Sequence, residues 1–405
     1  MERLRNIFLG PWRAVVVLGV TQILAWGFLW YPPTLTIPLI AAEHGWSLSF
    51  GMAGLSGGLL VGGLCAPTIG RSIDRFGGHV VMTLGSLAGA AGLVALTLVS
   101  DPLGYFLTWM FLGGAMAASL YDSAFATLGR IFGMEARRPI TLLTFAGGFA
   151  STVGWPSTQF LIEHVGWRGA YLTFACLLAF VAAPLHAFVL PRTRAEYPVL
   201  VPSEKSPSTQ AASPPPAFPL LVIVVIAFAA YAFITSGLSA HMLTIIARGG
   251  LDTATAVAVG ALFGPAQVLA RFCEFSFGGK THPLLITRFA VVLVLLGFAL
   301  LLLMQISTAT AVIFVLLFGI SNGLITVARG TVPLVLFGPV GYGRMVGRIA
   351  GGSLAMQSFA PVALASAIEW KANPGGIVML TLFAAVSLVA FSLANRRAAK
   401  HEPGR

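Results

Sequence analysis

The chain has 405 residues, of which 57% are hydrophobic and only 9% are charged. Soluble domains usually carry about 25% charged residues, so this composition excludes a soluble globular protein. The net charge of +11 does not indicate a nucleic-acid partner, because the basic residues stand singly or in pairs between long apolar runs.

Long apolar segments follow one another along the whole chain. A helix needs roughly 20 mainly apolar residues to cross a bilayer, and twelve segments meet this condition. Their ranges are 14–40, 48–69, 79–99, 103–128, 139–162, 169–190, 217–246, 253–277, 282–304, 308–328, 345–368 and 374–394. The sequence therefore predicts an all-α membrane protein with twelve transmembrane helices. The first segment is longer than the apolar region of about 7–15 residues in a signal peptide, so we expect it to be retained.

The longest polar stretch, residues 191–217, separates the predicted helices into two sets of six. It contains the run Pro214-Pro215-Pro216 and cannot bury enough apolar area to fold alone. We predict an N-terminal bundle over residues 1–190, a linker over 191–217 and a C-terminal bundle over 218–405.

The two predicted bundles share short motifs in the same order. Pro156 recurs as Pro361, and Trp167-Arg168 recurs as Trp370-Lys371, each about 205 residues later. A near-constant offset favours a six-helix unit that is used twice with pseudo-symmetry.

The distribution of basic residues predicts the orientation in the membrane. If the N-terminus is cytoplasmic, the outer loops contain only Arg168, Arg248 and Lys371 among the Lys and Arg residues. This asymmetry satisfies the positive-inside rule. We predict a multi-pass protein of the cell inner membrane with both termini in the cytoplasm.

A glycine-rich segment with adjacent opposite charges follows the second predicted helix, where we expect a loop. Gly70, Asp74, Arg75 and Gly77 resemble the signature of the major facilitator superfamily, Gly-x-x-x-Asp-Arg/Lys-x-Gly, although His79 stands where the family often has Arg or Lys. The resemblance implies a major facilitator fold that works by alternating access. It also implies that Gly70, Asp74, Arg75 and Gly77 form a conformational latch that holds one state closed on the cytoplasmic side.

Other patterns of the superfamily are matched to different degrees. Gly166-Trp167-Arg168 resembles a common Gly-Trp-Arg motif, and we expect it to anchor the sixth helix at the headgroup level. The Gly-Pro pair of antiporters is interrupted, because Trp155 lies between Gly154 and Pro156. Trp109 stands where proton-coupled drug exporters have an arginine, and both departures weigh against drug–proton antiport.

Ionisable residues inside predicted helices are the sharpest functional candidates. A charge at the bilayer centre costs about 2.5–3.5 kcal/mol, so such residues face the bundle interior. Arg271 lies in the eighth helix, and a guanidinium in an apolar site can bind a carboxylate through two parallel hydrogen bonds. It resembles the helix-eight arginine of the monocarboxylate and oxalate–formate branches of the superfamily. The alternative is a structural bridge between Arg271 and Glu274 at i,i+3.

Two carboxylates are candidates for coupling transport to an ion. Asp122 in the fourth helix and Glu274 in the eighth could carry a proton, because burial favours the neutral form of a carboxyl group. Asp122 could equally pair with Arg130, two turns further along its helix.

Polar and aromatic residues at similar depth are candidates for contacting substrate. Besides Arg271, they are Gln267, Asn322, Trp30, Tyr31 and Trp155. Trp26 and Trp30 are spaced i,i+4, so both rings lie on one face of the first helix, just before Pro32-Pro33 breaks it. They are candidates for an outer gate.

No phosphate-binding loop, nucleophile elbow, zinc-protease motif or cysteine pair occurs in the sequence. We therefore expect no enzyme activity, no cofactor and no metal site. We predict a monomeric secondary transporter that moves a small organic anion, such as a monocarboxylate, by proton symport or by anion exchange. Its partners would be a small-molecule substrate, the lipid bilayer and, in the symport case, protons. The alternatives left open are efflux of a drug or metabolite, a non-transporting membrane sensor and a membrane enzyme that acts on lipid.

Overall fold

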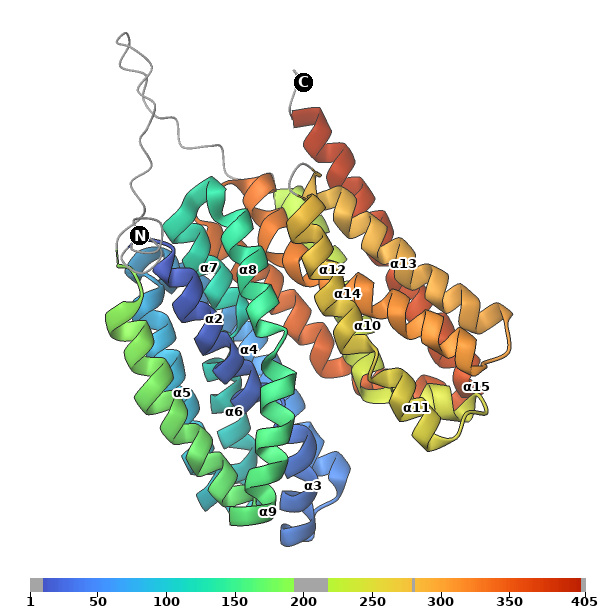
Figure 1. Ribbon diagram of the computed structural model, residues 1–405, viewed down its shortest axis with the longest axis horizontal. Helices are drawn as coiled ribbons and strands as arrows, with labels where there is room; N and C mark the ends of the chain where they lie inside the picture. Colours follow the sequence, from blue (N-terminus) through green and yellow to red (C-terminus); the bar gives the residue numbers. More distant parts are fainter. Residues whose placement is uncertain (1–9, 193–217, 279–280, 402–405) are drawn as a thin grey trace.

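The computed structural model describes residues 10–192, 218–278 and 281–401, and every element within them is helical (Figure 1). The N-terminal half contains α2 (Arg13–Ala25), η1 (Trp26–Trp30), α3 (Pro33–His44), α4 (Leu48–Phe76), α5 (Gly78–Leu98), α6 (Pro102–Ser119), α7 (Tyr121–Phe132), η2 (Gly133–Ala136), α8 (Arg137–Gly147), α9 (Ala150–Leu177), η3 (Leu178–Ala182) and η4 (Leu185–Val189). The C-terminal half contains α10 (Phe218–Arg248), α11 (Thr253–Gly260), α12 (Phe263–Phe277), α13 (Pro283–Leu303), α14 (Thr308–Phe337) and α15 (Tyr342–His401).

Ten helical stretches in the described residues are long and apolar enough to cross a membrane. One of them, Pro102–Val189, has 88 residues and reverses direction near Gly133 and Gly166, both of which have positive φ angles. These reversals divide it into three crossings, which agrees with the predicted twelve-helix fold. Within α15, Gly376 packs against Ile368, although eight residues of continuous helix would separate them by about 12 Å. The chain therefore folds back there between two crossings.

The membrane helices extend beyond their apolar segments. The predicted loop after the second helix is wrong as to its form, because α4 continues as helix to Phe76 and only Gly77, with φ of 90°, separates it from α5. Similarly, α14 continues to Phe337 instead of ending near residue 328. Hydropathy marks where a helix leaves the membrane, but the backbone hydrogen bonds of the helix continue into the headgroup region.

Each half buries an apolar core of its own. Phe28 stacks on Phe174 in the N-terminal half, and Phe228 meets Phe391 edge-on in the C-terminal half. Of the predicted linker, residues 193–217 lie outside the described residues. The boundaries of the two bundles therefore remain a prediction.

The halves meet mainly at one end, which we call the Gly77 end and which includes Gly133 and Gly338. There and near mid-membrane, α4 crosses α15 with Gly70 against Gly343 and Gly63 against Gly351, so close that a Cβ would touch the opposite backbone. We call the opposite end, which includes Gly45 and Gly166, the Gly166 end. Toward that end the halves diverge, with α3 on one side and α11 on the other (Figure 1).

Within the N-terminal half, glycines also set the distance between α4 and α6. A Cβ at Gly113 would overlap the carbonyl group of Gly58, whereas a Cβ at the neighbouring Gly114 would meet nothing within 4 Å. Small residues at helix crossings in membranes allow backbones to approach in this way.

We expect Gly113→Val to destabilise the protein, because its side chain would push α6 away from α4. Overpacking of this kind costs about 1–3 kcal/mol. The measurement is the melting temperature of the purified protein in detergent. Gly114→Val is the matched control and should melt close to the wild type; equal losses in both variants would contradict the proposed packing constraint.

Candidate functional site

Arg271 is buried on α12, where its guanidinium reaches across to the N-terminal half. The residue is only 5% exposed. Nη1 donates to the carbonyl oxygen of Thr144 on α8 at 2.7 Å, and Nη2 donates to Oε1 of Gln267 at 3.2 Å. Nε has no acceptor. Among the described residues no carboxylate forms an ion pair with Arg271, and the groups that accept from its guanidinium are neutral.

A chain of amides and hydroxyls holds Gln267 in place behind Arg271. Asn322 on α14 donates from Nδ2 to Oε1 of Gln267 at 2.9 Å, and Thr235 on α10 donates to Oδ1 of Asn322 at 3.1 Å. Because Oε1 of Gln267 accepts from both Asn322 and Arg271, the amide is fixed with its oxygen toward the guanidinium. Three helices of the C-terminal half thus fix the position of the arginine.

Aromatic side chains from the N-terminal half surround the other side of Arg271. The Tyr121 hydroxyl donates to the same Thr144 carbonyl at 3.4 Å and lies beside the guanidinium. The phenol of Tyr31 lies close enough to Arg271 to feel the charge of the guanidinium. The Tyr31 ring contacts the ring of Trp155, with the two centroids 5.0 Å apart. Trp26 contacts Tyr121 at 5.0 Å. We call the group formed by Trp26, Trp30, Tyr31, Tyr121 and Trp155 the aromatic wall.

A π-helical turn places the first helix in this wall. At η1 the amide of Tyr31 donates to the carbonyl of Trp26 at 3.2 Å, which is an i→i+5 bond. Pro32 and Pro33 follow and lack the amide hydrogens that an α-helix would use there. Single π-turns of this kind occur often at functional sites.

Glu274 lies one turn from Arg271 but binds the opposite half. Its Oε1 accepts from Nη2 of Arg137 at 3.2 Å, and its Oε2 accepts from the Thr141 hydroxyl at 3.0 Å. Arg137 also donates to the carbonyls of Gly278 and Thr281. The alternative of an i,i+3 bridge between Arg271 and Glu274 is therefore wrong, because Arg137 takes the carboxylate.

Asp122 also crosses between the halves. Its Oδ2 accepts from Nη2 of Arg329 on α14 at 2.8 Å. Arg130, the alternative partner considered from the sequence, donates instead to the carbonyls of Ile73 and Asp74. Each half therefore gives one acid and one base to the interface: Asp122 and Arg137 from the first, Glu274 and Arg329 from the second.

Asp74 makes a third link between the halves at the Gly77 end. Its two carboxylate oxygens accept from the backbone amides of Gly343 at 2.9 Å and Arg344 at 2.8 Å. These amides belong to the first turn of α15, where an anion satisfies free donors and the helix dipole. Arg75 is exposed, and its guanidinium lies over the ring of Phe76.

Comparison with known proteins decides the family. The sequence pattern of the Major Facilitator Superfamily matches residues 15–361. The chain belongs to this superfamily. It is a multi-pass membrane protein, and the superfamily consists of secondary transporters and not of enzymes.

Individual members of the superfamily are similar at lower levels. Monocarboxylate transporter 3 of Rattus norvegicus is 37% identical over 109 residues, which are 26% of this chain and 22% of that one. Monocarboxylate transporter 6 of Homo sapiens is 28% identical over 203 residues, which are 46% and 38% of the two chains. The matched segments therefore span less than two fifths of these relatives. The crystal structure of the human organic anion transporter MFSD10 (TETRAN) has the same fold, with a TM-score of 0.72, 16% identity and coverage of 95% and 99%.

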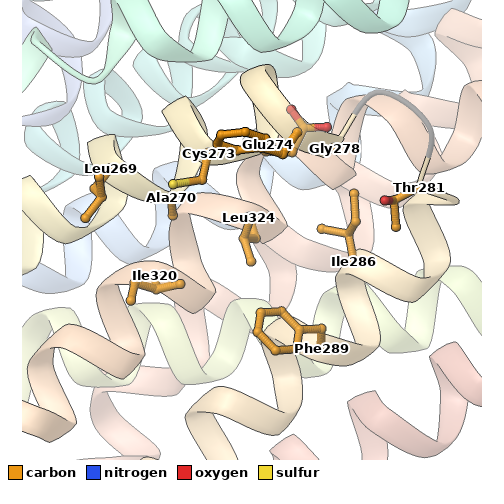
Figure 2. A pocket seen from close by; sticks show the side chains of 11 residues that line it. Leu269, Ala270, Cys273, Glu274, Gly278, Thr281, Ile286, Phe289, Ile320 and Leu324 are labelled. Atoms are coloured by element: carbon orange, nitrogen blue, oxygen red, sulfur yellow. The ribbon is translucent and has the colours of Figure 1, made fainter.

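An apolar groove on the C-terminal half of the protein lies apart from the Arg271 site. It is lined mainly by Leu269, Cys273 and Phe277 of α12 and by residues of α13 and α14, with Glu274 at its edge (Figure 2). Leu269 is 58% and Phe277 is 80% exposed, as side chains that face lipid would be. The two sides of α12 thus differ, one directed at lipid and one carrying Gln267 and Arg271.

The structure adds groups that the sequence did not identify as part of a site. Thr144 contacts Arg271, and Arg137 and Thr141 contact Glu274, all from the N-terminal half. Tyr121 donates to the Thr144 carbonyl beside Arg271. Thr144 acts through its backbone carbonyl, which no side-chain pattern reveals. Arg137 stands directly after η2, in what reads from the sequence as a topological loop charge.

We expect Glu274→Gln and Asp122→Asn to open the Gly77 end, because each removes the carboxylate that pairs with an arginine of the opposite half. Removing one partner of a fully buried ion pair costs about 3–5 kcal/mol. Three of the four side chains here are 18–22% exposed, so we expect a smaller cost, which still shifts a two-state equilibrium. The measurement is a distance distribution between spin labels at positions 76 and 340, which are exposed at this end in different halves, in a cysteine-free background.

The matched control for these variants is Glu43→Gln. Glu43 pairs with Arg168 at 2.7 Å within the N-terminal half, so its loss should leave the distance distribution unchanged. An unchanged distribution in both Glu274→Gln and Asp122→Asn would contradict the assignment of these pairs to the interface between halves.

Asp74→Ala should speed amide hydrogen exchange at Gly343 and Arg344, because it removes both acceptors from the start of α15. Loss of such a cap costs about 0.5–2 kcal/mol. The same variant should also lengthen the distance between the labels at the Gly77 end. Asp101→Ala is the control, since Asp101 caps α6 through the amide of Gly104 within one half. If Asp74→Ala frays the first turn of α15 but leaves the distance between the labels unchanged, Asp74 acts only as a helix cap and does not hold the halves together.

Proposed function

We propose that this protein transports a small organic anion, such as a monocarboxylate, by alternating access, with Arg271 as the anion-binding group. The observation that supports this most is the charge balance around Arg271. Its guanidinium is buried among a carbonyl, an amide and phenols, and Nε is still free. A buried charge without a counter-charge is costly, and a carboxylate bound through two hydrogen bonds would neutralise it.

The names of similar proteins support the same class of substrate. Both relatives described above are called monocarboxylate transporters, and the protein with the same fold is called an organic anion transporter. We extend these names to this chain because Arg271, the residue with an unbalanced charge, is suited to anions.

We propose that binding is linked to the interface through α8 and α12. Thr144 and Thr141 lie one turn apart on α8 and meet Arg271 and Glu274, which lie one turn apart on α12. A carboxylate bound to Arg271 would compete with the Thr144 carbonyl for Nη1. Binding would then weaken one of two neighbouring links between the halves and favour their separation at the Gly77 end.

The candidates for ion coupling are the two carboxylates of the interface. Protonation of Asp122 would weaken its pair with Arg329, and protonation of Glu274 would weaken its pair with Arg137. Proton binding would thus act on the same contacts as substrate binding. Symport with protons and exchange of anions both remain within this proposal.

We propose that the protein lies in the inner membrane with its Gly77 end facing the cytoplasm. Arg71, Arg75, Arg344 and Arg348 gather on α4 and on the start of α15 at this end, as the positive-inside rule requires of a cytoplasmic face. With this orientation the structure is closed toward the cytoplasm, and substrate enters from the Gly166 end.

Arg271→Gln should abolish uptake of a labelled monocarboxylate into proteoliposomes, because a neutral side chain cannot balance the carboxylate. Arg271→Lys should retain part of the affinity, since an ammonium group keeps the charge but not the paired geometry. Uptake is measured together with the melting temperature of each variant. Arg248→Gln is the control, because Arg248 is exposed at the end of α10.

The same assay separates the alternatives. Full uptake by Arg271→Gln would refute the anion site. A sensor would give no flux in sealed vesicles for any substrate. An exporter of drugs would accumulate a cationic or neutral dye in inverted vesicles and ignore carboxylates.

A further inference from the structure

We infer that the transported anion carries an aromatic body, so that the site selects an aromatic monocarboxylate over a short aliphatic one. This inference rests on the proposed function, because Arg271 supplies the contact for the carboxylate. The feature that carries the further step is the aromatic wall, which adjoins the guanidinium and extends from it toward the Gly166 end.

The wall consists of two groups of rings in contact, one around Trp26 and one formed by Tyr31 and Trp155. Trp26 contacts Trp30 at 5.2 Å and Tyr121 at 5.0 Å, while Tyr31 contacts Trp155 at 5.0 Å. The angles between planes are 63° for Trp26 and Trp30 and 66° for Tyr31 and Trp155, which are edge-to-face contacts. Such arrangements leave ring faces and edges at angles that another ring can fit.

The residues of the wall lie at increasing distances from Arg271. Tyr121 lies beside the guanidinium and Tyr31 lies within its electrostatic range. Trp155 lies in the second turn of α9, seven residues beyond Gly148, whose Cα lies close to Arg271, so it stands about 10 Å nearer to the Gly166 end. A ligand with its carboxylate on Arg271 would place a ring two or three bonds away against Tyr31 and Trp155.

Two polar atoms of the wall are occupied by protein partners, whereas Nε1 of Trp26 has none. Nε1 of Trp155 donates to the Thr34 hydroxyl at 3.2 Å, and the Tyr121 hydroxyl donates to Thr144. The rings of these residues therefore offer mainly carbon surface to a ligand. Trp155 is still 46% exposed, although it contacts Tyr31 and Thr34, so its ring has surface left to cover.

A packing role alone does not account for this composition. Elsewhere in the half, Phe28 and Phe174 stack at 4.4 Å as buried core residues. The wall residues differ, because none of them is fully buried and two of them, Tyr31 and Tyr121, lie near the charge of Arg271. A wall of aromatic residues beside an unbalanced cation fits a ligand that is anionic at one end and aromatic at the other.

The experiment measures binding of three probes to the full-length protein in lipid nanodiscs by isothermal titration calorimetry. The probes are 3-phenylpropionate, propionate and 3-phenylpropanamide. We expect 3-phenylpropionate to bind on the order of tenfold more tightly than propionate, as one well-packed aromatic contact provides. The neutral amide should bind far more weakly than 3-phenylpropionate.

Variants then assign the preference to the wall. Trp155→Leu should lower the affinity for 3-phenylpropionate about tenfold and leave propionate unchanged. Tyr31→Leu is a second variant with the same expected pattern, in case the first does not fold. Phe160→Leu is the matched control, because Phe160 is an exposed ring on the same helix that stacks on His164 and lies outside the wall.

Failure of this inference is distinguishable from failure of the proposed function. If propionate binds in a manner that depends on Arg271 but 3-phenylpropionate binds no more tightly, the aromatic preference is overturned and the anion site stands. The same holds if the preference survives in folded Trp155→Leu and Tyr31→Leu. If neither carboxylate binds, or if Arg271→Gln binds both as the wild type does, the proposed function itself fails.

Discussion

Two ion pairs, with the acid of each pair in a different half, hold the two halves of the protein together. Asp122 and Arg137 come from the first half, and Arg329 and Glu274 answer them from the second. In the interior of a membrane protein each of these charges requires a partner, water or a proton. The pairs exist only while the halves touch at the Gly77 end. Separation is therefore possible only when the four groups are hydrated or neutralised, so the stability of this conformation depends on charge state as much as on packing.

The pairing also connects the interface between the halves to the Arg271 site through two short helices, α8 and α12. They carry both the interface contact at Glu274 and the guanidinium of Arg271, one helical turn apart. Glycines permit this arrangement, because α8 ends at Gly147 and a Cβ at Gly148 would crowd Nη1 of Arg271. The break leaves the Thr144 carbonyl available to Tyr121 and Arg271 as well as to the Gly148 amide. The local backbone geometry thus places the contacts of Arg271 and the contacts between the halves on the same two helices, α8 and α12.

The sequence was sufficient to predict the helices and the family, because hydropathy and the motif around Asp74 are local properties. It also identified Arg271, Asp122 and Glu274 as unusual, since charges inside apolar segments are visible one at a time. Their partners were not predictable in the same way. Local spacing suggested Glu274 as the partner of Arg271 and Arg130 as the partner of Asp122. In the structure Glu274 pairs with a residue 137 positions away in the chain, and Asp122 pairs with one 207 positions away. Only the packing of one half on the other brings such residues together. The contribution of Thr144 was hidden further, because it comes from the backbone.

The charge of Arg271 also constrains how the proposed transport cycle is completed. With an anion bound, the site is neutral, and the halves can rearrange around it without moving a net charge through an apolar region. Without an anion, the guanidinium keeps only its neutral partners, Thr144 and Gln267, through the same rearrangement. The empty carrier therefore has the higher barrier of the two, by the cost of an uncompensated charge. Since the nearby carboxylate of Glu274 is engaged by Arg137 and Thr141, it does not relieve this charge while the Gly77 end is closed. This electrostatic asymmetry favours return of the carrier with a second anion, so exchange follows more directly from the geometry than net uptake does.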